Sequence, residues 1–76
     1  HVVMTYEDRP GIVAIYGRAF GEADINIAGM QIARTTAGGK ALSILTIDQA
    51  APEALLAEIG DAIDADSIRQ IDLVEL

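Results

Sequence analysis

A polar cluster, Tyr6-Glu7-Asp8-Arg9-Pro10-Gly11, separates two apolar segments near the start of the chain. The apolar run before it is typical of a strand, and the apolar residues after it recur at helical spacing from Ile12. The backbone amides that follow Gly11 have no partner inside such a helix and lie at the positive end of its dipole. This place can bind a small anion such as a carboxylate. The alternative is a capped turn that binds nothing.

The composition describes one small domain, or a piece of a larger protein. The 76 residues are 51% hydrophobic and 22% charged, which is ordinary for a globular domain. The net charge of −7 and only five scattered Lys and Arg residues argue against nucleic acid. The absence of Cys and the single His exclude disulfides, thiolate or multi-His metal sites and a Ser/His/Asp set. With no signal peptide or membrane-length apolar run, we expect a cytoplasmic domain without membrane contact.

The hydrophobic pattern predicts four strands and two helices in the order βαββαβ. The strands are expected at Val2–Tyr6, Ile25–Arg34, Lys40–Ile47 and Ile68–Val74, and the helices at Gly11–Ala23 and Pro52–Ala62. Right-handed crossovers then set a ferredoxin-like topology of class α+β, a four-stranded antiparallel sheet with two helices on one face. In this topology the first and third strands are central, and the second and fourth are edges.

Local detail within these elements is also predicted. A β-bulge is expected at Ala28-Gly29, a hairpin turn at residues 36–39, and a turn at Asp24. Tyr16 and Phe20 are expected in the core. The buried stripe of the first helix is expected to hold Ile12, Ile15, Tyr16, Ala19 and Ala23, and that of the second Leu55, Leu56, Ile59, Ala62 and Ile63. Three acidic residues crowd the C-terminal end of the second helix, Asp61, Asp64 and Asp66, so that end is expected to fray rather than to bind calcium.

The two predicted edge strands differ in charge. No residue from Ile25 to Ala33 is charged, whereas the last strand and its end carry Arg69, Asp72 and Glu75. Proteins usually protect an exposed edge with charge. We therefore expect the second strand to be covered by its own copy across a two-fold dimer. A short strand protected by its bulge is the alternative.

Polar groups suited to an amino acid gather around this predicted interface. Asn26 begins the second strand and is expected at the end of its own subunit opposite to the polar cluster. A two-fold dimer brings Asn26 of one chain to the cluster of the other. Asp8 and Asn26 can then take an ammonium group, the amides near Gly11 and Ile12 a carboxylate, and Tyr6 supplies a hydroxyl or a wall. A site shared between subunits couples binding to subunit geometry.

These residues also carry a resemblance to a known family. Asp8-Arg9-Pro10-Gly11-Ile12-Val13, followed by Phe20-Gly21-Glu22-Ala23-Asp24-Ile25-Asn26-Ile27, resembles the ACT domain, a regulatory module that binds small molecules. The stretches from Gly39 to Asp48 and from Ile68 to Leu73 are similar to the C-terminal ACT domain of actinobacterial D-3-phosphoglycerate dehydrogenases. The resemblance covers essentially the whole chain, so residues 1–76 are interpreted as one ACT regulatory domain.

The resemblance implies a non-catalytic domain that binds L-serine between two ACT domains and mediates feedback inhibition in serine biosynthesis. It implies serine contacts from Tyr6, Asp8 and Asn26, and a homodimer through the second strand and first helix. The predicted ligand-binding set is completed by Arg9, Pro10, Gly11 and Ile12. No cofactor is expected in this domain, and NAD is expected in the parent dehydrogenase.

Three alternatives stay open. In the first, the chain is an ACT domain of another enzyme, or a stand-alone regulator, that binds a different amino acid. In the second, it is an oligomerisation module that binds nothing. In the third, it is an acylphosphatase-like enzyme in which Arg9 and Asn26 serve as the catalytic Arg and Asn, although the surrounding loop lacks that family's pattern.

Overall fold

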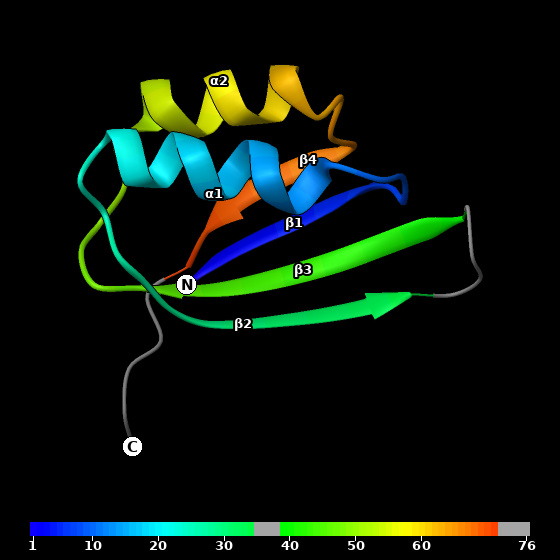
Figure 1. Cartoon of the computed structure of the whole chain (residues 1–76), viewed down its shortest axis with the longest axis horizontal. Helices are drawn as coiled ribbons and strands as arrows, with labels where there is room; N and C mark the ends of the chain where they lie inside the picture. Colours follow the sequence, from blue (N-terminus) through cyan, green and yellow to red (C-terminus); the bar gives the residue numbers. More distant parts are fainter. Residues whose placement is uncertain (35–38, 72–76) are drawn as a thin grey trace.

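The fold is a four-stranded antiparallel sheet with two helices packed on one face (Figure 1). The computed structural model describes residues 1–34 and 39–71. In chain order the elements are β1 (Val2–Glu7), α1 (Ile12–Glu22), β2 (Ile27–Arg34), β3 (Lys40–Ile47), α2 (Glu53–Ala62) and β4 (Ser67–Gln70). The strand order is β2-β3-β1-β4, so β1 and β3 are central. The predicted ferredoxin-like βαββαβ fold is therefore confirmed.

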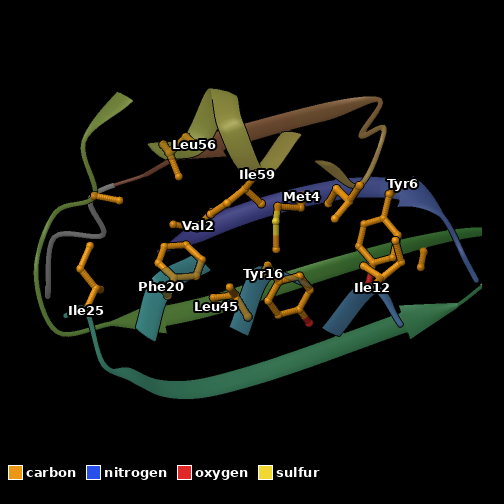
Figure 2. Packing of buried hydrophobic residues seen from close by; sticks show 13 residues of the cluster. Val2, Met4, Tyr6, Ile12, Tyr16, Phe20, Ile25, Leu45, Leu56 and Ile59 are labelled. Carbon is orange, nitrogen blue, oxygen red and sulfur yellow. The ribbon is translucent and has the colours of Figure 1, made fainter. Parts of the chain in front are cut away.

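The core lies between the sheet and the helices (Figure 2). Alternation along β1 and β3 points every second side chain toward the helices. Val2 pairs with Leu45, and Tyr6 pairs with Ala41, and all four are buried. The predicted core residues Tyr16 and Phe20 are confirmed, because neither side chain is exposed to solvent.

The buried stripe of α1 differs from the prediction. The helix buries Ile12, Tyr16 and Phe20, a row with a spacing of four residues. Ile15 is 39% exposed, because it turns toward a groove between α1 and α2 instead of the sheet. Ala23 follows the last turn as the C-cap and is exposed. The prediction was wrong for Ile15 and Ala23. Helical spacing shows that one side of the helix is apolar, but it does not show which of two adjacent rows of residues faces the sheet.

The stripe of α2 is shifted less. Leu56, Ile59 and Ile63 are buried, as predicted. Leu55 is half-buried and Ala62 is exposed, so the prediction was wrong for Ala62. The sheet lies under only one side of this helix, and Ala62 borders the same inter-helix groove as Ile15.

Both helices end in the same closed turn. Asp24 and Asp64 adopt left-handed backbone angles, with φ of 60° and 52°. Beyond them, the amide of Ile25 donates to the Phe20 carbonyl at 2.9 Å, and that of Ala65 to the Gly60 carbonyl at 2.8 Å. This is the Schellman pattern, which satisfies the last carbonyls of a helix. The predicted turn at Asp24 is confirmed. The expected fraying of the end of α2 stays a prediction.

The strand boundaries mostly follow the sequence. The register of β2 against β3 shifts between Ile27 and Gly29, which confirms the predicted bulge. β2 begins at Ile27 rather than Ile25, and β4 begins at Ser67 rather than Ile68. The described part of β4 ends at Gln70, and its predicted continuation from residue 72 to Val74 lies outside the described residues. Residues 36–38 of the predicted hairpin and residues 72–76 lie outside the described part of the chain.

Stability at alkaline pH depends on Tyr16. Burial raises the pKa of its hydroxyl above the ordinary value, the Ser43 hydroxyl lowers this pKa in part, and the nearby Tyr6 raises it again. A raised folded-state pKa means that the contribution to stability is complete below about pH 10 and is lost as the pH rises above it. The free energy of unfolding, measured with denaturant from about pH 8 to 11, should therefore fall more steeply in the wild type than in Tyr16→Phe. Equal slopes in the two proteins would contradict this assignment.

Candidate functional site

A pocket of about 500 Å³ opens where the end of β1, the start of α1 and the end of β2 meet. We call it the β1–α1 pocket. Its lining consists of Tyr6, Asp8, Arg9, Pro10, Gly11, Ile12, Val13, Ala14, Ile32 and Arg34. Every predicted ligand-binding residue except Asn26 is in this set. The polar cluster recognised in the sequence therefore forms one wall of a real concavity.

The start of α1 presents free backbone amides to this pocket. Gly11 is the N-cap, with φ of 90°, and among the described residues no side chain caps the helix. The first helical bond runs from the Ile15 amide to the Gly11 carbonyl, at 3.2 Å. The amides of Ile12, Val13 and Ala14 precede this bond, and the first turn contains no acidic residue. These free amides and the helix dipole give the start of α1 a partial positive charge, which suits an anion.

Position 11 favours glycine because its backbone is in the left-handed region, with φ of 90°. A Cβ at this position would meet nothing within 4 Å, so the reason is not a close approach within the chain. Gly11→Ala should lower the free energy of unfolding by about 1–2 kcal/mol, the cost of the left-handed region for an L-residue. Gly21→Ala is the matched control, because Gly21 lies on α1 with similarly open space and an ordinary helical φ. That variant should gain about 0.5–1 kcal/mol. Denaturant titration of both measures the difference, and equal effects of the two substitutions would count against this reading.

Asp8 forms an ion pair across the pocket. Its amide donates to the Gly39 carbonyl at 2.7 Å, which holds the backbone in place after β1. Its Oδ2 atom lies 3.2 Å from Nε of Arg34. The Asp8 side chain is 17% exposed and that of Arg34 is 61% exposed. The pocket thus contains a negatively and a positively charged side chain in contact.

The sequence analysis missed Arg34. β1 and β2 are both antiparallel to β3, so they run parallel to each other and end at the same side of the sheet. Tyr6 and Arg34 indeed share Ala41 as their partner on β3. The predicted topology already implied this proximity, because it sets Arg34, the charged residue at the end of β2, beside Asp8.

Tyr6 forms an internal wall. Its side chain is 2% exposed, and its hydroxyl lies 2.7 Å from Oγ of the fully buried Ser43. The hydroxyl is therefore used inside the protein, and the ring borders the pocket. Between the two roles foreseen for Tyr6, a hydroxyl or a wall, the geometry favours the wall.

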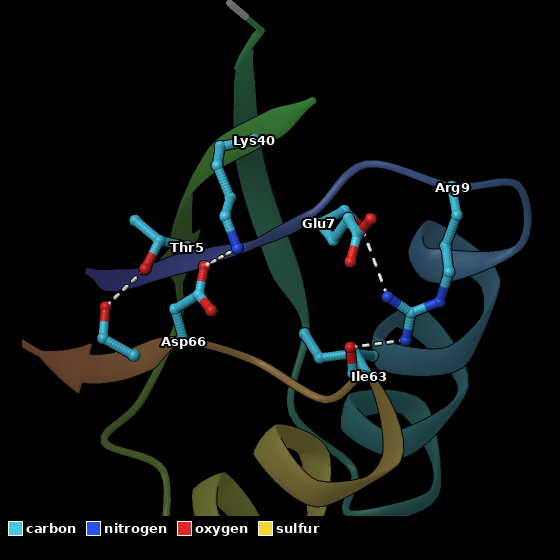
Figure 3. Close-up of polar contacts among 7 residues, drawn as sticks. Thr5, Glu7, Arg9, Lys40, Ile63 and Asp66 are labelled. Atoms are coloured by element: carbon cyan, nitrogen blue, oxygen red, sulfur yellow. Dashed lines mark hydrogen bonds and ion pairs between the residues drawn. The ribbon is translucent and has the colours of Figure 1, made fainter. Parts of the chain in front are cut away.

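The Arg9 side chain is held by main-chain carbonyl groups (Figure 3). Its guanidinium donates to the Glu7 carbonyl at 3.2 Å and to the Ile63 carbonyl at 2.5 Å. Ile63 follows α2, where carbonyl groups and the helix dipole attract a cation. Arg9 thus ties the loop before α1 to the end of α2, and its part in ligand binding stays a prediction.

A second polar group holds the neighbouring loop (Figure 3). Nζ of Lys40 lies 2.7 Å from Oδ2 of Asp66, and the hydrogen bond to Asp66 raises the pKa of Lys40. The amide of Asp66 also donates to the Thr5 carbonyl at 2.8 Å. These contacts hold the segment between α2 and β4 against the end of β1 and the start of β3.

Asn26 lies at the opposite end of the sheet, as the sequence analysis predicted for one subunit. Its Nδ2 donates to Oδ2 of Asp48 at 3.0 Å, and it borders a separate hollow of about 220 Å³. The β2–β3 register runs from Ile27 opposite Ile47 at this end to Arg34 opposite Ala41 at the other (Figure 1). The six steps along β3 from Ala41 to Ile47 put roughly 20 Å between the two ends.

The described residues contain neither a candidate metal site nor a helix that could span a membrane. Within 1–34 and 39–71, no group of His, Asp or Glu side chains could hold a metal ion. Across the same residues, no helix is long and apolar enough to cross a membrane.

Comparison with known proteins identifies a family. The sequence model of the ACT domain family matches residues 1–64. The chain is 35% identical over 72 residues to the D-3-phosphoglycerate dehydrogenase of Bacillus subtilis, 32% over 73 residues to that of Mycobacterium tuberculosis, and 30% over 71 residues to that of Methanocaldococcus jannaschii. These matches cover 95%, 96% and 93% of this chain but only 14% of each relative.

A solved structure shares the fold. The crystal structure of an unknown protein from Galdieria sulphuraria matches with a TM-score of 0.72 and 20% identity, over 99% of this chain and 45% of that one. At this identity the likeness concerns the fold alone. Because the family model covers most of the sequence and the βαββαβ fold agrees, the chain belongs to the ACT domain family, a family of regulatory, non-catalytic modules.

Proposed function

We propose that this chain is the regulatory domain of a D-3-phosphoglycerate dehydrogenase and binds L-serine for feedback inhibition of serine biosynthesis. The observation that carries the proposal is the Asp8 carboxylate beside the uncapped start of α1 in one pocket. The names of the relatives support a D-3-phosphoglycerate dehydrogenase as the parent enzyme. We propose that this parent is NAD-dependent and cytoplasmic, and that the present chain is its regulatory part, without catalysis or cofactor.

The β1–α1 pocket has the charges that a zwitterion needs. The ammonium group of an amino acid binds Asp8, because a partly buried carboxylate pairs well with a cation. The carboxylate group binds the free amides of Ile12 and Val13. The Tyr6 ring, with Pro10 and Gly11 shaping the loop, forms the wall behind the ligand.

We propose in addition a homodimer through β2 and α1. Met30 and Ile32 on β2 are 47% and 40% exposed, and Val13 on α1 is 43% exposed. The register places Met30 opposite Leu45 and Ile32 opposite Ser43, so both point to the helix side of the sheet. An edge strand without charge from Ile27 to Ala33, beside exposed apolar side chains, is a surface that proteins normally cover.

A two-fold dimer of this kind completes the ligand site. Antiparallel pairing of two β2 strands about their centre sets Ile27 of one copy opposite Arg34 of the other. Asn26 of the partner subunit then lies beside the β1–α1 pocket, although within one chain it is a sheet length away. Serine binding and subunit association are thereby coupled.

The test is calorimetric titration of the 76-residue chain with L-serine, glycine and other amino acids. We expect heat with L-serine, and we expect Asp8→Ala and Asn26→Ala each to weaken its binding by about 1–3 kcal/mol, the usual loss for a partner of a charged group. Asp61→Ala is the control, because Asp61 is exposed on α2 and borders neither hollow. The absence of both heat and a thermal shift at millimolar serine would refute the serine proposal.

A ligand-free oligomerisation module is the second candidate. The observation that favours it is the ion pair between Asp8 and Arg34, which already satisfies the carboxylate within one chain. A dimer that persists unchanged and gives no response to any amino acid in the same titration would support this reading. A response to glycine or another amino acid but not to serine would instead identify a different ligand for the same pocket.

A further inference from the structure

We propose that Arg34 binds the ligand's carboxylate together with the free amides of Ile12 and Val13, and so restricts the β1–α1 pocket to free amino acids. The inference rests on the proposed amino-acid binding in this pocket, and it adds a residue from β2 to a site otherwise built from β1, α1 and the partner's Asn26. The geometry that carries it is the single contact between Nε of Arg34 and Oδ2 of Asp8 at 3.2 Å.

Most of the guanidinium of Arg34 is available to a ligand. The group has five N–H donors in a planar fork, and within the described part of the chain only the one at Nε is used. The side chain lines the pocket and is 61% exposed. The outer nitrogens can therefore meet a carboxylate in the pocket without any rearrangement of the main chain.

The other cation in the pocket lining is committed elsewhere. Arg9 donates to two main-chain carbonyls, those of Glu7 and Ile63, and holds the loop to α2. The role of the charged carboxylate receptor falls to Arg34, because among residues 1–34 and 39–71 it is tied to a side chain, that of Asp8, and not to the main chain. An ion pair between side chains can be exchanged for a ligand, whereas a main-chain clamp cannot be released without loosening the fold.

Exchange with a zwitterion leaves every charge paired. In the free protein Asp8 and Arg34 neutralise each other. When an amino acid enters, its ammonium group takes Asp8 and its carboxylate takes the Arg34 fork, which favours two parallel hydrogen bonds. A ligand whose carboxylate is replaced by a neutral amide offers Asp8 a partner and leaves Arg34 without one. The pocket should therefore discriminate strongly between an amino acid and its amide.

The position of Arg34 adds a consequence for regulation. Arg34 is the last residue of β2, the strand that forms the proposed dimer interface. A ligand held between Asp8 and Arg34 joins the end of β1 to the end of this edge strand. Ligand binding therefore acts directly on the strand through which the two subunits meet.

The experiment compares L-serine with L-serinamide, which keeps the ammonium and hydroxyl groups and lacks the carboxylate. Dissociation constants are measured by calorimetry for the wild type, Arg34→Gln and Arg34→Lys. We expect the wild type to prefer serine by at least about tenfold, and Arg34→Gln to prefer it by no more than about twofold. Arg34→Lys, which keeps the charge but loses the fork, should show an intermediate preference.

The control is Arg18→Gln, because Arg18 is 81% exposed and pairs with Glu22 on α1, away from the pocket lining. Its preference for serine should equal that of the wild type. Melting temperature and dimer fraction are recorded for each variant, and if Arg34→Gln does not fold, Arg34→Lys decides by its preference alone.

The outcomes separate the two proposals. If Arg34→Gln or Arg34→Lys weakens serine and serinamide equally, so that the preference is unchanged, Arg34 only positions Asp8 and this inference is wrong while serine binding stands. If the wild type binds serine and serinamide equally well, the carboxylate is not read and the inference again fails alone. If the wild type binds neither compound, the proposed function fails together with it.

Discussion

Met30→Glu is expected to convert the proposed dimer into a monomer and to abolish L-serine binding with it. Met30 lies near the middle of β2, and its side chain is 47% exposed. Near a two-fold axis, one substitution places two carboxylates close together and removes them from water. Such like-charge contacts cost several kcal/mol, so the dimer dissociation constant should rise by at least about 100-fold. Sedimentation measures the dimer, and calorimetry on the same samples measures serine binding.

Ile15→Glu is the matched control for this prediction. Ile15 is also an exposed apolar residue, at 39%, but it borders the groove between α1 and α2. The added charge is the same, and the proposed interface is left untouched. Equal loss of the dimer in both variants would place the interface elsewhere. Serine binding at full strength by monomeric Met30→Glu would show that the site is not shared between subunits.

Phe20→Ala is expected to have the largest effect on stability. The Phe20 ring is fully buried between α1 and the sheet, and its carbonyl accepts the capping bond from Ile25 (Figure 2). Truncation of a buried phenylalanine typically costs about 3–5 kcal/mol through lost burial and the cavity left behind. A domain of this length has roughly 4–11 kcal/mol of stability in total. The variant should therefore be close to unfolding, as measured by denaturant titration.

Phe20→Leu provides the comparison for this cavity argument. Leucine keeps much of the buried volume, so its cost should be less than half that of alanine. L-serine should raise the midpoint of both variants, because a ligand that binds only the folded state stabilises it. A loss below about 1 kcal/mol in Phe20→Ala would mean that the core relaxes around the missing ring.

The helix α1 serves three functions at once. Its buried row, which includes Tyr16 and Phe20, packs on the sheet. Its first amides face the β1–α1 pocket, and Val13 lies on the proposed dimer surface. A shift of this helix would therefore change the proposed ligand site and the proposed subunit contact together. This arrangement gives a regulatory domain a simple means of relating ligand binding to subunit geometry.

The buried hydroxyls connect these surfaces through the core. Tyr6, which borders the pocket, lies 2.7 Å from Ser43, and the hydroxyl of Tyr16 donates to Sδ of Met30 at 3.1 Å. Ser43 also affects the pKa of Tyr16, so the three hydroxyl groups are neighbours. Satisfied polar groups of this kind hold the core in one arrangement, because a displaced hydroxyl would lose its partner.

The sequence alone determined the order of the elements, the central and edge strands, the bulge at Ala28-Gly29 and the turn at Asp24. Hydrophobic period and turn chemistry are local properties, so they can be read along the chain. The position of Gly11 before a helix was also visible, although the helix begins one residue later, at Ile12, and Pro10 stands outside it.

Only the tertiary structure decided which charges meet. Arg34 lies beside Asp8 because two parallel strands end together, and the Arg9 guanidinium reaches Ile63 because α2 ends beside that loop. These contacts join residues 26 and 54 positions apart. They depend on how strands and helices pack sideways, which periodicity along one element does not contain. The same reason explains the errors at Ile15 and Ala62, since the neighbouring helix, and not the helix's own pattern, decides which flank is covered.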